Sequence, residues 1–180
     1  DGIKQLQEAG TEVVIVETGS TFDSVYKSIE MIGTATGKST EAEQIVTDMK
    51  DKVNELKKKA EGITETKSVW VEISPQPDIY TAGNGTYINE MLEMIGAVNV
   101  AGDLEGWPKV SEEEAVNMNP DVILTTYGYY VEDAREQILA RDGWQEVTAV
   151  KNGDVYDVIS DMVTRSGPRL VEGMEEIAKA

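Results

Sequence analysis

The sequence predicts an α/β fold: a Rossmann-like lobe of three layers around a mostly parallel sheet, preceded by a long spine helix and by the remnant of a second lobe. Short apolar runs alternate with helical patterns through residues 63–180, as a parallel sheet covered by helices requires. Residues 39–61 carry one amphipathic pattern without internal Gly or Pro. The apolar run at 13–16 has no strand-like neighbour before it.

The first seventeen residues predict the end of a helix and a strand. Ile3, Leu6 and Ala9 have helical spacing, and Gly10 ends that helix. The run Val-Val-Ile-Val at 13–16 is typical of a strand buried on both faces of a parallel sheet. Because a lone strand has unsatisfied edges, we expect its neighbours in a lobe that precedes this chain. Residues 1–19 are therefore assigned to the remnant of an N-terminal lobe.

Residues 20–62 predict a helical linker. A first helix is expected over 21–32, with a break at the Gly-Thr-Ala-Thr-Gly stretch of 33–37. The spine helix follows over 39–61, with a capping box between Thr40 and Glu43 and with Gly62 as its stop. Its predicted apolar face consists of Ala42, Ile45, Val46, Met49, Val53, Leu56 and Ala60.

Residues 63–180 predict the substrate-binding lobe. Strands are expected over residues 68–74, 99–101, 121–126 and 155–158. Helices are expected over residues 86–95, from a Ser111–Glu114 capping box to Asn119, over 131–139 and over 170–178. The carboxyl ends of parallel strands share one edge of a sheet, so the loops that follow them are the expected site.

The composition excludes several function classes. A net charge of −18 repels phosphate backbones and anionic lipid headgroups, so we expect no nucleic-acid partner and no direct membrane insertion. The chain contains no Cys and no His, which removes thiol and imidazole catalysis and the usual zinc ligand sets, so no metal site is expected. The start of the sequence has no signal-peptide pattern. The protein is therefore cytoplasmic, or the sequence begins inside a longer chain.

Aromatic and polar side chains gather on the predicted carboxyl-edge loops. They are Tyr80, Trp107, Tyr127, Tyr129, Tyr130, Met162 and Arg165. Trp and Tyr on loops are typical of a pocket or an interface, although such residues also cover the rim of a core. Arg165 precedes a predicted helix, so it is placed to bind an anionic or carbonyl-rich ligand, or to pair with Asp161 or Asp157 at the surface.

Catalysis has little support. The Gly83-Asn84-Gly85 stretch lacks the third glycine of a dinucleotide fingerprint, because Ile88 stands there. Asp157 and Asp161 could act as an acid–base pair, but paired carboxylates are expected by chance in so acidic a chain. We expect no enzyme. A Rossmann-like domain that uses a nucleotide or flavin, and an interaction domain without a pocket, remain the alternatives.

Three segments resemble the C-terminal lobe of the helical-backbone substrate-binding proteins of ABC importers. They are SVWVEISPQPDIYTAGNGTYINEMLEMIGAVNV, GWPKVSEEEAVNMNPDVILTT and VYDVISDMVTRSGPRL. The stretch EAGTEVVIVETGSTFDSVYKSIEMIGTATGK resembles the end of that family's N-terminal lobe. The resemblance implies capture of a ferric siderophore, cobalamin or haem between two stiffly held lobes, and its delivery to a permease dimer without chemistry on the ligand.

The resemblance also implies site residues. Trp107 with Pro108 matches the place where vitamin B12 binders set a Trp-Pro against the ligand, and Met162 stands where they have Trp. The ligand-binding candidates are Tyr80, Trp107, Tyr127, Asp161, Met162 and Arg165. Glu113 matches the carboxylate that reaches an arginine cluster on the permease.

The ligand expected from the resemblance is an iron–siderophore or cobalamin complex. Haem is disfavoured as a direct ligand of this lobe because the chain has no His, although Tyr could coordinate its iron. We expect no cofactor other than the transported ligand. The resemblance implies an extracytoplasmic location, with a lipid anchor on the intact protein.

Overall fold

The computed structural model describes residues 2–180 and contains a five-stranded, mostly parallel sheet. The strands are β1 (Ser68–Ser74), β2 (Tyr80–Thr81), β3 (Val98–Asn99), β4 (Val122–Thr125) and β5 (Val155–Asp157). Strand β1 pairs in parallel with β3 and β4, and β4 pairs in parallel with β5. Only β2 is antiparallel, against the carboxyl end of β1. The α/β fold with a mostly parallel sheet is therefore confirmed.

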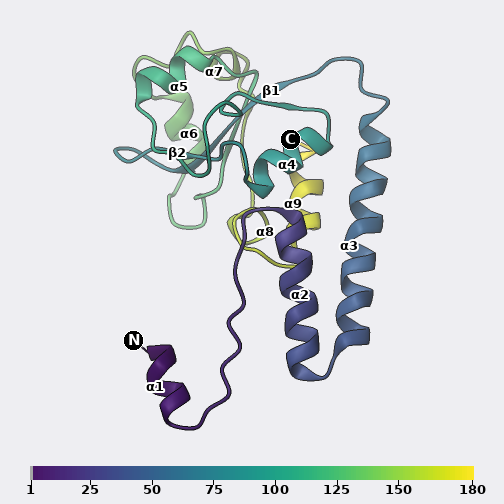
Figure 1. The fold of residues 1–180 in the computed structure, drawn as a ribbon. Coiled ribbons are helices and arrows are strands. Elements are labelled where there is room, and N and C mark those ends of the chain that lie inside the picture. Colours follow the sequence, from purple (N-terminus) through teal and green to yellow (C-terminus); the bar gives the residue numbers. More distant parts are fainter. Residues whose placement is uncertain (1) are drawn as a thin grey trace.

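Helices cover both faces of this sheet and give it three layers (Figure 1). Helices α3 (Ser39–Ala60), α4 (Tyr87–Met94) and α9 (Leu170–Ile177) share one core with Val69, Val71 and Leu124. Helices α5 (Glu112–Met118), α6 (Ala134–Leu139) and α7 (Thr148–Asn152) share the other core with Trp70 and Ile123. Successive strand residues thus enter opposite cores, because side chains alternate across a sheet.

Two long helices form a hairpin beside the lobe (Figure 1). Helix α3 is one continuous helix, as predicted, and it buries Ala42, Val46, Met49, Val53 and Leu56. The predicted Thr40–Glu43 capping box is wrong, since the helix begins at Ser39 and its N-cap position is Lys38. Helix α2 (Phe22–Thr36) passes through the predicted break and ends at Gly37 in the left-handed conformation.

Gly33 explains why that break was misplaced. It lies inside α2 and is buried, and a Cβ atom there would lie 2.3 Å from the Cβ of Ala42 on α3. The two helices therefore approach closely at a point that only glycine permits. Gly33 serves helix packing, and Gly37 alone ends the helix.

The predicted strand at 13–16 is wrong. Helix α1 (Gly2–Glu8) is followed by an extended segment that pairs with no strand among residues 2–180. Figure 1 shows this segment running from α1 to α2 away from the sheet. Val14 and Ile15 are 56% and 58% exposed. An apolar run forms a strand only where a neighbouring strand meets its backbone groups, and none of the described residues provides one.

Smaller differences fall in the second half of the lobe. Helix α6 begins at Ala134, later than predicted, because residues 127–131 form a turn in which the Tyr127 carbonyl accepts bonds from the amides of Tyr130 and Val131. The short helix α8 (Ser160–Val163) lies in a segment predicted as loop, and α7 was not predicted. Helices of four or five residues are too short to leave a periodic pattern in the sequence.

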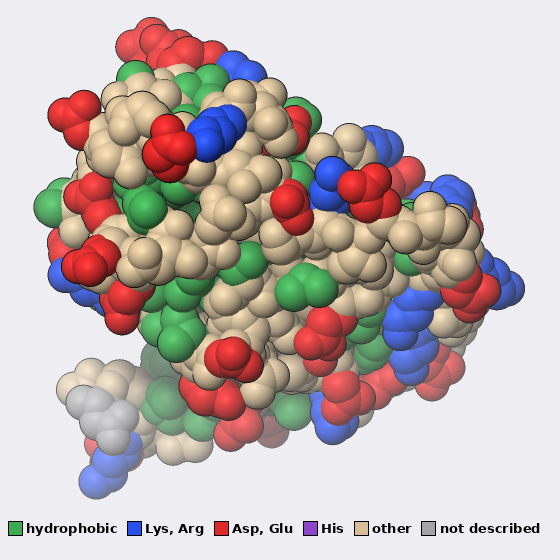
Figure 2. All heavy atoms as spheres, turned by 90° about the horizontal axis from the view of Figure 1, so that it is seen from above, with side chains coloured by type: hydrophobic (Ala, Val, Ile, Leu, Met, Phe, Trp, Pro, Cys, Tyr) green, Lys and Arg blue, Asp and Glu red, His purple; other side chains and the backbone are tan. Residues whose placement is uncertain are grey.

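Acidic side chains spread over the face drawn in Figure 2, with basic side chains between them. This face has no broad basic patch of the kind that binds a phosphate backbone. Within residues 2–180, none of the helices has the length and apolar character needed to cross a bilayer.

Candidate functional site

Tyr80 and Trp107 lie on neighbouring segments beside the carboxyl end of β1. The amide of Thr81 donates to the carbonyl of Pro108 at 3.1 Å, and the amide of Gly83 donates to the carbonyl of Gly106 at 2.8 Å. This pairing brings the two predicted ligand-binding residues together at the surface. Tyr80 is 41% exposed and Trp107 is 36% exposed, so both aromatic rings are accessible from solvent.

Tyr87 joins these segments to the loop that follows β5. Its ring packs edge-to-face against the ring of Trp107, with 5.4 Å between the ring centres. Its hydroxyl donates to the Thr164 carbonyl at 2.6 Å, and burial raises its pKa. Sequence reasoning missed this role because Tyr87 was predicted only as the start of a helix. The signal was its place directly after the Thr86 N-cap, which puts it at the end of the helix that faces the loops.

Asp161, Met162 and Arg165 lie on and just after α8. The Nε of Arg165 donates to the carboxylate of Asp161, and this bond holds the pKa of Asp161 below its usual value. Arg165 therefore pairs with Asp161 at the surface, which is the second of the two alternatives expected for Arg165, beside binding of an anionic ligand. Met162 is half-buried and packs against the core beneath α9, so much of its side chain faces away from solvent.

Tyr127 does not lie on the exposed surface where a ligand-binding residue was expected. It is 2% exposed, and its hydroxyl donates to Oε1 of Glu72 at 2.6 Å inside the lobe. Burial, followed by the negative charge of Glu72, raises the pKa of Tyr127. The exposed aromatic residues of this loop are its neighbours: Tyr129 is 76% exposed and Tyr130 is 55% exposed. The sequence grouped the three tyrosines but could not tell which ring points inward.

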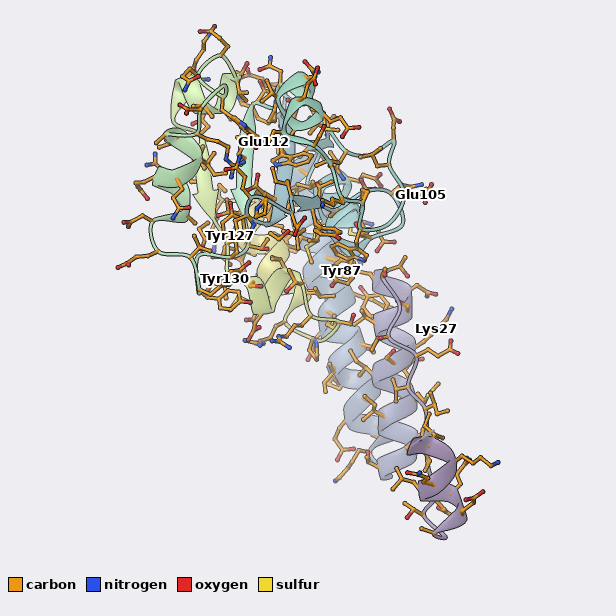
Figure 3. The ribbon with its side chains drawn as sticks, turned by 90° about the vertical axis from the view of Figure 1, so that its left-hand side faces the viewer. Lys27, Tyr87, Glu105, Glu112, Tyr127 and Tyr130 are labelled. Carbon is orange, nitrogen blue, oxygen red and sulfur yellow. The ribbon has the colours of Figure 1, made fainter. Side chains whose placement is uncertain are left out.

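Figure 3 looks onto this side of the lobe. It shows Tyr130 beside Tyr127, and Tyr87 near the upper end of the helix hairpin. Glu112 is drawn apart from them, above Tyr127 in this view. The aromatic loops and the first turn of α5 are therefore separate surfaces, which we call the aromatic edge (Tyr80, Trp107, Tyr129 and Tyr130) and the acidic turn (Glu112–Glu114).

Glu113 is exposed on the acidic turn. The predicted capping box beside it is confirmed: the Ser111 amide donates to Glu114 at 2.8 Å, and the Glu114 amide donates to the Ser111 hydroxyl at 3.2 Å. These bonds lower the pKa of Glu114. Glu112 lines a polar groove of about 540 Å³ together with Gln76, Gln137, Arg141 and Asp142. Glu113 is thus the member of the turn that neither caps the helix nor lines the groove.

A second groove lies at the opposite end of the sheet. It has a volume of about 560 Å³, and its apolar lining includes Leu56, Ala60, Val69, Ile95 and Val122. It lies at the amino ends of β1 and β4, away from the loops that carry the aromatic edge. The aromatic edge is an open surface, so the candidate site is identified by its side chains and its place on the sheet.

The chain matches a family model described as periplasmic binding protein over residues 1–162. It is 49% identical over its whole length to YvrC, an ABC transporter substrate-binding lipoprotein of Bacillus subtilis, and 29% identical over 99% of its length to a cobalamin-binding protein of Halobacterium salinarum. It spans 57% and 49% of those two proteins, so it corresponds to about half the length of these curated relatives.

Solved structures agree with this match. A possible iron-binding, periplasmic solute-binding protein from Staphylococcus epidermidis superposes with a TM-score of 0.88 at 34% identity, covering 98% of this chain and 69% of that one. The vitamin B12-binding protein BtuF of Vibrio cholerae superposes with a TM-score of 0.75 at 21% identity, over 99% of this chain and 68% of that one, which supports the fold alone.

These findings confirm three expectations from the sequence. The fold is that of the substrate-binding proteins that the sequence resembles. The relatives are solute-binding proteins and not enzymes, so the enzyme alternative loses its support. The extracytoplasmic location agrees with the family description. The chain belongs to the periplasmic binding protein family.

Proposed function

We propose that this chain supplies the ligand-capturing lobe of an ABC importer's solute receptor, and that the ligand is an iron–siderophore or cobalamin-type complex. In this proposal residues 63–180 form the binding lobe, residues 20–62 the helical linker, and residues 1–19 belong to the neighbouring lobe. The filled receptor delivers its ligand to a permease dimer. The names of the relatives support the receptor role, since they include a transporter substrate-binding lipoprotein, a cobalamin-binding protein and an Fe(3+)-citrate-binding protein.

The observation that carries the proposal is the aromatic edge. Its four residues are between 36% and 76% exposed, and they lie on β2 and on loops beside the carboxyl end of the sheet. Exposed Trp and Tyr supply large apolar contact area with few rotatable bonds, so they bind large ligands at a small entropic cost. Tyr80 and Trp107 keep their proposed ligand contacts, whereas buried Tyr127 would need to leave the core to reach a ligand.

The negative charge of the chain favours one class of ligand over another. The chain carries a net charge of −18, and the guanidinium of Arg165 already pairs with Asp161, with Arg169 lying 3.8 Å from the same carboxylate. An anionic ligand would meet a repulsive field with little free positive charge to offset it. A neutral or cationic complex, such as a ferric hydroxamate or cyanocobalamin, therefore suits this lobe better than ferric citrate or molybdate.

Calorimetric titration tests the proposal. The full protein is titrated with cyanocobalamin, a ferric hydroxamate siderophore, ferric citrate, haem and molybdate. Cyanocobalamin or the ferric hydroxamate is expected to bind with the highest affinity. Tight binding of molybdate or ferric citrate alone would overturn the ligand class, and failure of the full protein to bind any of the five would contradict the proposed receptor role.

Tryptophan fluorescence then locates the contact. Trp70 and Trp144 are 0% and 1% exposed, whereas Trp107 lies on the aromatic edge. Acrylamide, a neutral water-soluble quencher, should therefore quench Trp107 far more than the two buried indoles, and bound ligand should protect it. A Trp107→Phe variant is the control, because the quencher-accessible signal should disappear from it both with and without ligand.

A further inference from the structure

A buried ion pair lies directly beneath one side of the aromatic edge. The guanidinium of Arg141 donates to the Glu72 carboxylate through Nη1 at 2.9 Å and through Nη2 at 2.8 Å. Glu72 is 0% exposed and Arg141 is 8% exposed. The Tyr127 hydroxyl donates to the same carboxylate at 2.6 Å. Strand β1, the turn after β4 and the segment that follows α6 therefore meet at one carboxylate.

Stability alone does not account for this arrangement. Removing the two charged groups from water costs several kcal/mol per ion, which is about as much as their mutual attraction regains. A pair of apolar side chains of similar volume often makes the fold equally stable. A carboxylate that receives two parallel bonds from one guanidinium is fixed in orientation as well as in place. The ion pair therefore fixes the position of the Tyr127 hydroxyl more precisely than an apolar contact would.

The turn that begins at Tyr127 is held from a second side. The Gly128 amide donates to Oδ1 of Asp157 at 2.9 Å, and the Thr125 hydroxyl donates to the same oxygen at 2.6 Å. The Tyr127 carbonyl closes the turn by accepting bonds from the amides of Tyr130 at 3.1 Å and Val131 at 3.0 Å. A Cβ atom at Gly128 would lie 2.1 Å from Oδ2 of Asp157, so only glycine fits there without displacing the carboxylate.

This doubly held turn carries the two most exposed rings of the aromatic edge. Tyr129 and Tyr130 pack edge-to-face with 4.7 Å between their ring centres, and Tyr130 also lies 6.2 Å from the ring of buried Tyr127. Figure 3 shows Tyr130 next to Tyr127. Side chains that are ordered before binding lose less entropy when a ligand arrives, so a fixed turn raises the affinity that they provide.

We propose that the buried Glu72–Arg141 pair, acting through Tyr127, positions Tyr129 and Tyr130 as a ligand-contacting aromatic wall. Glu72, Arg141 and Tyr127 are positioning residues, and the two exposed tyrosines make the contact. This inference rests on the proposed function for its ligand. It assigns the ligand contacts of this loop to Tyr129 and Tyr130, the second and third residues after Tyr127.

The first experiment tests the positioning without a ligand. Tyr127→Phe removes one hydroxyl and keeps the ring in the core. Amide hydrogen exchange of Tyr130 and Val131 should accelerate by about tenfold, since the turn loses a hydrogen bond to a charged group, which is stronger than a bond between neutral groups. Amides of β1 and β4 should exchange at unchanged rates. Equal exchange of the turn amides in both proteins would overturn the positioning role, and faster exchange throughout the lobe would show a merely structural one.

The second experiment removes the charges together. Glu72→Met, Arg141→Leu and Tyr127→Phe are combined, so no buried charge is left unpaired. The combined variant should still unfold cooperatively, but its turn amides should exchange faster and its affinity for cyanocobalamin or the ferric hydroxamate should fall by about tenfold. Unchanged exchange and affinity in a folded variant would contradict the proposal. If the combined variant does not fold, the single Tyr127→Phe variant still tests the proposal.

A third comparison disturbs the turn from its exposed side. Gly128→Ala forces the Asp157 carboxylate away from the turn, whereas Gly167→Ala in the neighbouring loop meets no atom within 4 Å. The first substitution should weaken binding of the same two probes by severalfold, and the second should not. Equal affinities in both variants would count against a role for the held turn.

Direct contact is tested by Tyr129→Ala with Tyr130→Ala against the corresponding Phe substitutions. The Ala pair should lose about tenfold or more in affinity, and the Phe pair should retain it, because stacking needs the ring and not the hydroxyl. Equal affinity of the Ala pair and the unchanged protein would refute the wall. If the unchanged protein binds neither probe, the proposed function fails, while the exchange measurement still decides the positioning role.

Discussion

The indole ring of Trp107 lies edge-to-face against the ring of Tyr87, with 5.4 Å between the ring centres. Tyr87 is 4% exposed and bonds through its hydroxyl to the Thr164 carbonyl, so it is fixed by the core and by the loop after α8. Trp107 is 36% exposed. One side of the indole is therefore supported by the protein, while part of its surface remains free for a ligand.

Trp107→Ala should weaken ligand binding by about 1–3 kcal/mol without unfolding the lobe, because it removes a supported aromatic anchor. Equilibrium dialysis with cyanocobalamin and the ferric hydroxamate measures the loss. Tyr156 is the control because its exposure equals that of Trp107. It lies away from the aromatic edge, since its hydroxyl faces Asp154, which lines the groove at the amino end of the sheet. Tyr156→Ala should leave affinity unchanged. A similar loss in both variants would remove the special role of Trp107.

Gly33→Ala should destabilise the protein although alanine is the better helix former. Helix propensity favours Ala by about 1 kcal/mol, but the new Cβ would meet the Cβ of Ala42 at 2.3 Å and the Lys38 carbonyl at 3.0 Å. Both neighbours belong to the packed end of the hairpin, so the steric overlap should outweigh the gain in helix propensity. The expected net loss is about 1–3 kcal/mol in the free energy of unfolding. Urea denaturation gives this value.

The control for Gly33→Ala is its combination with Ala42→Gly, which returns the lost space. Ala42→Gly alone should cost about 1 kcal/mol through helix propensity. If the two positions share one packing contact, the combined loss is smaller than the sum of the single losses. Additive losses would show that the close approach of α2 and α3 is not what requires glycine.

Asp121 predicts a specific acid sensitivity. The Ser68 hydroxyl donates to its carboxylate at 2.7 Å and the Ser68 amide donates at 2.9 Å, and these bonds lower the pKa of Asp121 from its ordinary value of 3.8. A lowered pKa means that the ionised form stabilises the fold. This stabilisation is fully present above the unfolded-state pKa, and it is lost as the pH falls through the lower folded-state pKa.

Asp121→Asn should therefore reduce the free energy of unfolding by a constant amount at neutral pH. The difference between the two proteins should shrink as the pH falls below about 4. Denaturant titrations from neutral pH to acid, with Ser68→Ala as a matched removal of the donor, measure it. A difference that grows on acidification would contradict the assigned direction of the pKa shift.

The arrangement of the lobe could be predicted from local patterns. The spine helix, β1 and the cap of α5 each follow from signals within a few residues: an unbroken amphipathic face, alternating apolar residues, and Ser111 with Glu114. The run at 13–16 failed because a strand depends on a partner that the local sequence does not contain.

The site was harder to predict than the fold because its geometry depends on contacts between distant residues. Tyr127 was chosen as a surface residue, but Glu72 lies 55 positions away in the sequence and holds the Tyr127 ring inside. Tyr87 was overlooked because its two partners, Trp107 and Thr164, come from separate loops. Tyr80 and Trp107 lie together, since paired backbone segments brought their loops side by side.

The three neighbouring carboxylates of the acidic turn have different structural roles. Glu114 caps α5 through Ser111, and Glu112 lines the polar groove with Arg141 and Gln137. Glu113 has neither task and is exposed. Acidic residues in the first turn of a helix are also favoured by the helix dipole, which alone would account for all three. A comparison of Glu113 with Glu112 is therefore needed to reveal a docking role.

We propose that Glu113 is a docking contact with an importer's permease. Glu113→Ala should then slow association with the permease by about three- to tenfold at low salt, because a carboxylate at a docking rim acts mainly by steering an arginine partner. The effect should shrink at high salt, where exposed charges are screened. Ligand affinity should not change, since Glu112, the first residue of the acidic turn, is drawn apart from Tyr87 and Tyr130 (Figure 3). Glu112→Ala, which removes the same charge one residue away, should bind the permease almost normally. Surface plasmon resonance with the permease complex in nanodiscs measures both variants. If they lose association rate equally, the acidic turn contributes only general electrostatics, and Glu113 is not the docking contact.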